Sequence, residues 1–279
     1  MDSETILKIL QNRLKLQRYA NNTIKSYCSY TQVFLEQMEK YNRLDEIPIS
    51  EIELFINRKV IQENISASYQ RSLVGAIKKV FELVENQKIE LNYLYPKRKV
   101  NKLPTFFSQE EVRNLLNATE NLKHKAILTI IYSCGLRLSE LINLKIADIK
   151  SESNLLLIRQ SKGNKDRIVA LPDKLLLLLR EYYKVYQPKD FLFEGAKGDQ
   201  YSERSVQLIL KNAMSKAGVL SKGSVHTLRH SYATHLIKSG IDVRVVQELL
   251  GHNDIRTTMI YTHITDIDKK STPSPLDFL

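Results

Sequence analysis

Six polar side chains in the later part of the sequence form a set that could act on a phosphate group. Guanidinium groups bind the non-bridging oxygens of a phosphate, where negative charge increases during phosphoryl transfer. Lysine and histidine side chains can move protons, and a tyrosine hydroxyl can act as a nucleophile. The set therefore suits phosphoryl transfer without a metal ion, and its members are Arg137, Lys162, His226, Arg229, His252 and Tyr261.

A zinc site is the main alternative for the histidines. Five of the six histidines lie between residues 226 and 263, and His226 and His230 have a four-residue spacing that zinc sites use. The segment His-Thr-Leu-Arg-His lacks the glutamate of a metalloprotease motif, however, and Arg229 would repel a cation. No cluster of carboxylates or thiols lies nearby in the sequence. We therefore favour the phosphate interpretation and expect no metal and no other cofactor.

The segment around Lys162 has the pattern of a β-hairpin. Residues 154–160 and 167–171 are rich in Leu, Ile and Val, which favours strands. Between them, residues 161–166 form a polar segment with one glycine, which is typical of a hairpin turn. The sequence thus predicts that Lys162 lies in the turn of an antiparallel pair of strands.

Helices are predicted to carry or flank the other five candidates. His226 and Arg229 are three residues apart and therefore share one face of a helix. Arg137 lies in a predicted turn that leads into a helix. A capping box at residues 108–111 marks the start of a helix that ends near residue 118. Further helices are predicted over about 126–132, 173–186, 203–217, 226–239, 242–249 and 255–263.

The first hundred residues are predicted to form a small bundle of four helices without catalytic residues. Apolar residues recur with the 3.6-residue period in each of the four segments. We expect Asn22 to cap the second helix, a capping box at residues 50–53 to start the third, and Ser66 to start the fourth. This bundle would form a first domain over residues 1–95.

Residues 96–104 have the composition of an exposed linker. Two prolines enclose four basic residues, and the segment contains no acidic residue. We therefore expect a second domain over residues 105–279. The basic side chains of this linker favour contact with a nucleic-acid backbone, although the prolines alone would suffice for a hinge.

Composition favours an intracellular protein with a polyanionic partner. The 279 residues include 42 Lys and Arg against 31 Asp and Glu, which gives a net charge of +11. Such an excess favours binding to nucleic acid, because neutralised phosphates release counterions, although some ordinary enzymes are equally basic. Two cysteines are too few for a disulfide framework, and no apolar stretch is long enough to span a membrane. We expect a cytoplasmic protein.

The order and spacing of the candidates resemble the tyrosine recombinase (phage integrase) family. The strings that carry the resemblance are Gly-Leu-Arg-Leu-Ser-Glu-Leu around Arg137, Lys-Gly-Asn-Lys-Asp-Arg from Lys162, His-Thr-Leu-Arg-His-Ser-Tyr-Ala-Thr-His-Leu from His226, and Glu-Leu-Leu-Gly-His to His252. The resemblance covers residues 105–265 strongly and residues 1–104 more weakly. The two-domain organisation looks like the simple, Xer-like members. One departure is Ser161, where the family often has glycine before the hairpin lysine.

The resemblance implies a mainly α fold and a role for each candidate residue. The N-terminal domain would be a four-helix, SAM-like core-binding domain, and the catalytic domain would be mostly α with a small antiparallel β-sheet. Tyr261 would attack a DNA phosphodiester and leave a 3′-phosphotyrosyl bond and a free 5′-hydroxyl. Arg137 and Arg229 would neutralise the phosphate, Lys162 would protonate the leaving oxygen, His226 would assist proton removal from Tyr261, and His252 would hydrogen-bond a non-bridging oxygen. The other histidines of this region are interpreted as packing or DNA-side residues.

The resemblance also implies the partners. The substrate would be double-stranded DNA with paired inverted binding arms, bound by four identical protomers or together with a second recombinase. No membrane and no nucleotide would be involved, and the protein would act on the nucleoid of a bacterium or archaeon. The chain end, residues 266–279, carries apolar residues that could fill a pocket on the next protomer. The biological task would be dimer resolution or the integration and excision of a mobile element. Two alternatives are a type IB topoisomerase and a non-catalytic architectural DNA-binding protein.

Overall fold

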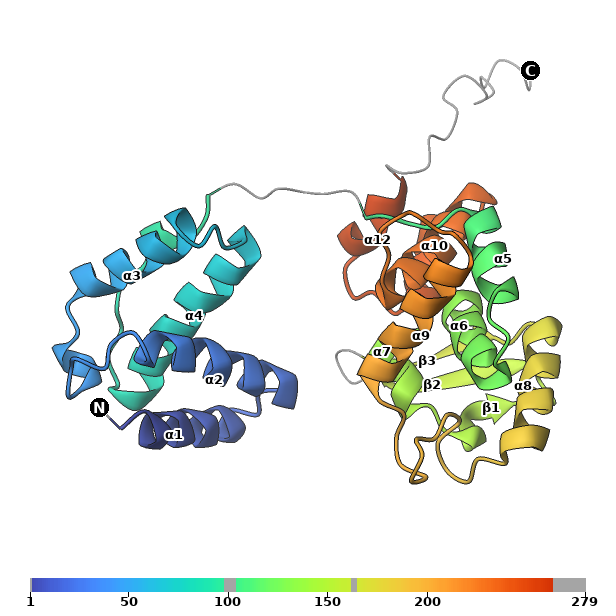
Figure 1. The fold of residues 1–279 in the computed structure, drawn as a ribbon, viewed down its shortest axis with the longest axis horizontal. Helices are drawn as coiled ribbons and strands as arrows, with labels where there is room; N and C mark the ends of the chain where they lie inside the picture. The colour runs from blue at the N-terminus through green and yellow to red at the C-terminus, as the bar shows by residue number, and fades with distance from the viewer. Residues whose placement is uncertain (1, 98–103, 162–164, 263–279) are drawn as a thin grey trace, which may run out of the picture. The chain divides into compact units, whose positions relative to one another are not determined.

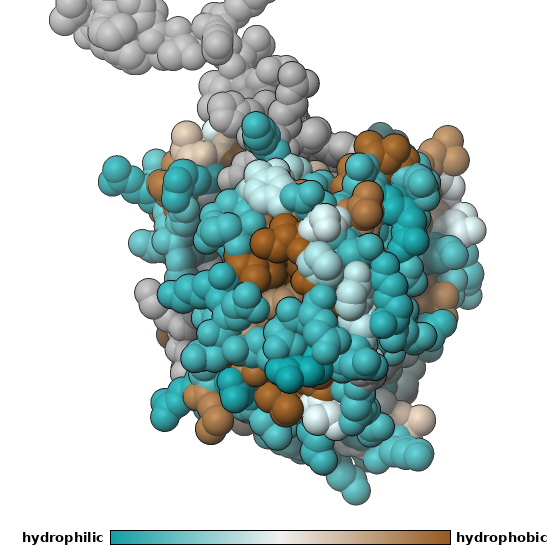
Figure 2. Space-filling view, turned by 90° about the vertical axis from the view of Figure 1, so that its left-hand side faces the viewer, coloured by the Kyte–Doolittle hydropathy of each residue, from teal (hydrophilic) through white to brown (hydrophobic). Residues whose placement is uncertain are grey.

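The computed structural model describes residues 2–97, 104–161 and 165–262, and its chain divides into two units (Figure 1). The first unit is Met1–Asn101 and the second is Lys102–Leu279. The predicted linker lies largely outside the described residues. None of the helices within the described ranges is long and apolar enough to cross a membrane. The face of the molecule drawn in Figure 2 is mostly hydrophilic, with small hydrophobic patches between polar side chains.

The N-terminal unit is a helical bundle, as predicted from the periodicity of its apolar residues. Its core is formed by one apolar face of each helix, and Leu10, Phe34, Ile52 and Ile77 are fully buried in it. Short 3₁₀ turns at Leu44–Glu46 and Asn92–Leu94 complete the unit. The helices are α1 (Ser3–Leu16), α2 (Asn21–Leu35), α3 (Ile49–Ile61) and α4 (Ala67–Val84).

Two of the three predicted helix starts in this unit are wrong. Helix α2 begins one residue before Asn22, after Ala20, and no side chain caps it. Helix α3 begins directly after Pro48, so the pattern at residues 50–53 lies within its first turn. The ring of Pro48 fixes the φ of this residue near −65°, while its ψ of 146° is extended. Pro48 is therefore the last non-helical residue, and the helix starts at Ile49. Ser66 does cap α4, because its hydroxyl accepts the N–H of Tyr69 at 3.1 Å.

The C-terminal unit combines helices with a small antiparallel sheet, as the resemblance implied. Its helices are α5 (Gln109–Asn117), α6 (Leu122–Cys134), α7 (Leu138–Asn143), α8 (Asp173–Tyr186), α9 (Glu203–Lys216), α10 (Val225–Lys238), α11 (Val243–Leu250) and α12 (Arg256–Thr262). The predicted capping box of α5 is present, since Ser108 and Glu111 each bind the other's backbone N–H. The sheet has the order β1-β2-β3, from β1 (Ile149–Lys150), β2 (Leu155–Ser161) and β3 (Lys165–Ala170).

The sheet contains the predicted hairpin and one strand that was not predicted. Strands β2 and β3 pair antiparallel, with Leu156 opposite Val169 and Ile158 opposite Arg167. Strand β1 has only two residues, too few to show an alternating pattern in the sequence. Lys162, expected in the turn between β2 and β3, lies outside the described residues.

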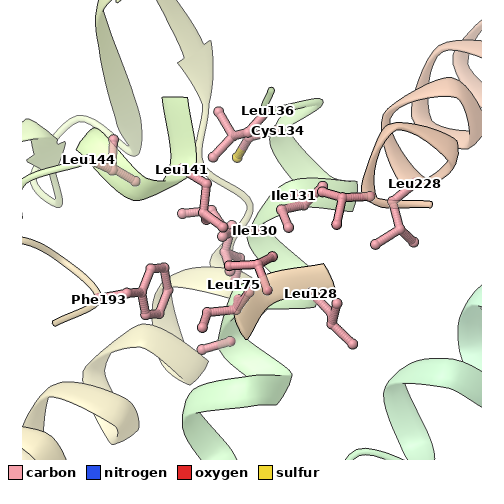
Figure 3. Packing of buried hydrophobic residues seen from close by; sticks show 14 of the residues in the cluster. Leu128, Ile130, Ile131, Cys134, Leu136, Leu141, Leu144, Leu175, Phe193 and Leu228 are labelled. Atoms are coloured by element: carbon pink, nitrogen blue, oxygen red, sulfur yellow. The ribbon is translucent and has the colours of Figure 1, made fainter. Parts of the chain in front are cut away.

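Helix α6 lies at the centre of the core of the C-terminal unit. It is apolar on most sides, and it packs against α8 and α10 among others. Figure 3 shows Ile130 and Ile131 of this helix among Leu141 of α7, Leu175 of α8 and Leu228 of α10. Elements far apart in the sequence are thus held together by one helix, and two of them carry candidate site residues.

The first residues of the C-terminal unit are attached to α10. The Phe107 side chain is fully buried, and its backbone N–H donates to the Ser231 hydroxyl of α10 at 2.8 Å. The neighbouring Phe106 ring contacts the His235 ring edge-on, with centroids 6.2 Å apart. Two successive residues therefore hold the start of this unit against the middle of α10.

A second, smaller apolar cluster joins the last three helices. It consists of Ala233 and Ile237 of α10, Val246 and Leu250 of α11, and Tyr261 of α12. Helix α12 has seven residues, so its position depends on this packing rather than on its own helical stability.

Candidate active site

Arg137 is placed by a sharp turn between α6 and α7. Gly135 ends α6 with φ of +58°, a left-handed conformation that favours glycine. A Cβ atom there would lie 2.5 Å from the Tyr232 ring, so only glycine fits. The turn puts Arg137 at the start of α7, where its guanidinium donates to Glu140 Oε1 at 2.6 Å and to the carbonyl oxygen of Gly251 at 3.0 Å.

Arg229 lies on α10 with a nearly fully buried side chain. Its guanidinium donates to the carbonyl oxygen of Gly135 and, at 2.6 Å, to that of Leu250. Burial, together with the positive charge of Arg137, lowers the pKa of Arg229 to about 9, so it remains protonated at neutral pH. The side chain is therefore a fixed positive charge held by the backbone of two other segments.

Glu140 connects the arginines into one cluster. Its carboxylate accepts two hydrogen bonds of 2.7 Å from Arg167 of β3, in addition to the bond from Arg137. Arg229 lies 3.7 Å from the same carboxylate, whose side chain is 3% exposed. We call Arg137, Glu140, Arg167 and Arg229 the arginine cluster. Three positive charges against one negative charge leave it with a net charge of +2, which suits the binding of an anion.

His252 extends the arginine cluster and is neutral. Its Nε2 lies 3.2 Å from the Arg229 guanidinium, which has only N–H donors, so Nε2 accepts. The proton is then on Nδ1, which donates to the Thr258 hydroxyl at 2.9 Å. Burial and the nearby arginines lower the pKa of His252 to about 4. The ring follows Gly251, whose left-handed φ of +61° ends α11.

His226 lies in the first turn of α10, on the same face as Arg229. It is half-buried, and burial together with the charges of Arg229 and Arg137 lowers its pKa below the ordinary value. In the part of the chain that the structure describes, the Tyr261 hydroxyl pairs with His230 and not with His226.

Tyr261 is buried on α12, with 1% of its surface exposed. Its hydroxyl lies 2.7 Å from Nδ1 of His230, and the two ring centroids are 5.6 Å apart. Burial raises the pKa of Tyr261, while the charges of Arg229 and Arg137 act in the opposite direction. The hydroxyl thus already lies within the electrostatic field of the arginine cluster.

The structure places five of the six candidates in one unit and adds residues that the sequence reasoning missed. Among the described residues, no three His, Cys, Asp or Glu side chains are grouped so that they could hold a metal ion. The missed residues are Glu140, Arg167 and His230. Glu140 and Arg167 lie within two of the strings that carried the resemblance, so their position in these strings was the available signal.

Both units match known families. Residues 105–267 match the phage integrase family, and residues 6–91 match the phage integrase N-terminal SAM-like domain. The chain is 33% identical over 268 residues to a tyrosine recombinase of Thermosipho africanus, with 91% of this chain and 93% of the relative covered. It is also 33% identical over 264 residues to tyrosine recombinase XerA of Pyrococcus horikoshii, covering 93% and 89%.

Solved structures agree with these matches. A XerH site-specific recombinase in a post-cleavage complex with its palindromic difH substrate has a TM-score of 0.74 at 26% identity, covering 95% of this chain and 82% of that one. A XerA recombinase has a TM-score of 0.55 at 28% identity, with 94% of both chains covered. The chain therefore belongs to the phage integrase family and is a tyrosine recombinase, an enzyme that cleaves and rejoins DNA in site-specific recombination.

Proposed function

We propose that Tyr261 attacks a DNA phosphodiester held by Arg137 and Arg229. The observation that carries this proposal is the arginine cluster, a net positive group beside a tyrosine hydroxyl. A bond forms between the Tyr261 oxygen and phosphorus, and the bond from phosphorus to the 5′-oxygen breaks. The two guanidiniums neutralise the charge that develops on the non-bridging oxygens, and His252 hydrogen-bonds one of them.

Proton transfer at both oxygens completes the proposed step. Lys162 protonates the leaving 5′-oxygen, which the arginines cannot readily do because their pKa is too high. His226 assists removal of the proton from Tyr261. The phosphotyrosyl bond conserves the energy of the broken bond, so a second 5′-hydroxyl can reverse the step without a nucleotide or another cofactor.

We further propose that the substrate is duplex DNA with paired inverted arms, bound by four protomers of this chain or together with a second recombinase. The net charge of +11 supports a DNA partner. A XerH relative is bound to a palindromic site, and a λ integrase of the same fold forms a tetramer on a Holliday junction. The chain would act on the nucleoid, in dimer resolution or in the integration and excision of a mobile element.

The proposal is tested by trapping the covalent intermediate. The full chain is incubated with sheared chromosomal DNA of its host and denatured rapidly, and the DNA that remains attached to protein is sequenced. We expect a recurrent sequence with two inverted arms, linked through its 3′-phosphate to Tyr261 in the tryptic peptide. Attachment through another residue would overturn the assignment of the nucleophile.

A second assay separates recombination from the alternatives. Two copies of the recovered site on one supercoiled plasmid should be exchanged by the chain. Relaxation of a plasmid that lacks the site, without exchange, would instead indicate a topoisomerase-like activity. Binding without any covalent product would indicate an architectural role.

A further inference from the structure

We infer that His230 is the residue that receives the proton of Tyr261 when the DNA strand is cut. The inference rests on the proposed function and names the proton acceptor in it. His230 Nδ1 is 2.7 Å from the Tyr261 hydroxyl, a normal hydrogen-bond distance for direct proton transfer. Among the described residues, it is the side chain that the structure pairs with the reacting oxygen.

The position of His230 in α10 suits this role. The charge of Arg229, one of the guanidiniums proposed to hold the phosphate, acts on both His230 and Tyr261, so the pair lies close to where that phosphate would be held. His226 is four residues earlier and shares a helix face with His230. His226 would then assist proton removal through His230, as the next titratable group along that face.

The charges around His230 keep a free nitrogen lone pair on its ring. Burial, with the charges of His226 and Arg229, lowers the pKa of His230 to about 4, so the ring is neutral at pH 7. The other ionisable groups that face it are Tyr261 of α12 and His252, which follows α11. A phosphate on Arg229 brings negative charge to this site, which offsets the guanidinium and makes the protonated ring more stable.

The proposed step balances in both directions. In cleavage, the Oη–H bond of Tyr261 breaks, its proton moves to Nδ1 of His230, and the Oη–phosphorus bond forms. The 5′-oxygen leaves and takes a proton from Lys162. In rejoining, a 5′-hydroxyl attacks phosphorus and gives its proton back to Lys162. The protonated His230 then returns its proton to the departing tyrosine oxygen.

The test compares His230→Asn with the parent on a nicked duplex that carries the recovered site. The Asn amide occupies nearly the position of Nδ1 and can still hydrogen-bond Tyr261, but it cannot take up a proton. We expect single-turnover cleavage at saturating DNA to slow by about 10²–10⁴-fold, with unchanged DNA affinity. Free imidazole should partly restore cleavage in His230→Ala. A rate within about threefold of the parent for His230→Asn would show that His230 only holds Tyr261 in place, and would overturn the inference.

His235→Asn is the matched control. His235 is also on α10, and its Nδ1 lies 2.9 Å from the hydroxyl of Tyr132, so it forms the same kind of pair away from the reacting groups. We expect this variant to cleave at the parent rate even if it melts earlier. An equal loss of cleavage rate in both variants would show that the substitutions act by disturbing the structure of α10, and would also overturn the inference.

Two further measurements distinguish a failure of this inference from a failure of the proposed function. A bridging sulfur in place of the 5′-oxygen makes the leaving group acidic, so it should not rescue His230→Asn; rescue would place His230 on the leaving-group side. If the parent forms no adduct, or Tyr261→Phe forms one, the proposed function itself is wrong. If both behave as proposed but His230→Asn cleaves normally, only the role of His230 is wrong.

Discussion

The arginine cluster and Tyr261 lie in the same unit but are held in different ways. Arg137, Arg167 and Arg229 are fixed by a shared carboxylate and by backbone carbonyl groups from several segments. Tyr261 is on a seven-residue helix that is held by a small apolar cluster and, among the described residues, by the side-chain hydrogen bonds His230–Tyr261 and His252–Thr258. The proposed phosphate-binding groups are therefore preorganised, whereas the proposed nucleophile lies on a short helix that depends on local packing.

This difference separates binding from chemistry. A phosphate can be held by guanidiniums that are already oriented, which lowers the cost of reorganisation in the transition state. Tyr261 is 1% exposed, so the groups that cover it must make room before a phosphorus atom reaches its hydroxyl. Short elements with limited packing are the parts of a protein that open at low cost. We therefore expect changes in the cluster to affect binding, stability and the rate of cleavage together, and changes at Tyr261 to affect cleavage with little change in binding.

Tyr261→Phe should have the largest effect on chemistry and almost none on binding. The variant lacks the proposed nucleophile, so no covalent adduct should form, while DNA affinity should stay within about twofold because the phosphate contacts remain. Denaturing gels measure the adduct, and gel shifts measure affinity. A large loss of affinity would show that Tyr261 contributes to DNA binding as the arginine cluster does, and would contradict the difference drawn between them.

Lys162→Ala should slow cleavage by about 10²–10⁴-fold, the range for a lost general acid. An alkoxide leaves poorly because an alcohol is about as weak an acid as water. With a bridging 5′-sulfur the leaving thiol has a pKa of roughly 8.5, and the variant should cleave nearly as fast as the parent. Arg137→Ala serves as the control that sulfur should not rescue. Failure of the rescue would mean that Lys162 positions DNA and that the acid is another residue.

Glu140→Gln should destabilise the arginine cluster and lower the free energy of unfolding. The change leaves three guanidiniums without their shared negative charge, and breaking such a buried pair costs about 3–5 kcal/mol. Urea unfolding measures this loss, and added DNA should offset part of it by supplying anionic groups. A loss below about 1 kcal/mol would show that the carbonyl contacts alone hold the arginines.

Gly135→Ala should destabilise the unit more than Gly240→Ala. Both glycines have positive φ, so each alanine costs about 1–2 kcal/mol in backbone strain. Only at Gly135 does the added methyl group meet the Tyr232 ring, which should cost about 1–3 kcal/mol more. Thermal unfolding compares the two variants. Equal losses would mean that the ring moves aside and that the turn before Arg137 is less tightly packed than described.

Stability should also depend on pH through His252. The pKa of His252 is lowered to about 4 in the folded chain, against about 6.5 when unfolded. The unfolded chain therefore binds more protons between these values, so stability is complete above pH 6.5 and falls as the pH decreases towards 4. Urea midpoints should show a shallower decline in His252→Gln than in the parent. An identical decline would indicate that His252 is protonated without cost.

Features that depend on local sequence could be predicted, and pairs between distant residues could not. The period of apolar residues gives α1 to α4, and the strings around Arg137 and Arg229 identify the family. The partners of Glu140 lie on α7, β3 and α10, so their meeting depends on how these elements pack. The pair of His230 and Tyr261 is 31 residues apart in the sequence and depends on the packing of α12.

Local signals also failed where another residue determined the conformation. The pattern at residues 50–53 has the residue types of a capping box, yet Pro48 has already started the helix. Asn22 is a good cap by type, but Ala20 takes that position and leaves the first turn without a side-chain acceptor. A favourable residue type therefore does not determine a helix boundary when a neighbouring residue already occupies the position that starts the helix.

The attachment of Phe106 and Phe107 to α10 gives the C-terminal unit a mechanical property. The same helix carries His226, Arg229 and His230. A pull on the chain just before this unit acts on buried contacts in the middle of α10, because the Phe107 N–H is bonded to Ser231 and the Phe106 ring contacts His235. Tension that enters through residues 104–107 is therefore borne by the helix that carries three of the proposed site residues, rather than being absorbed by a loose surface segment.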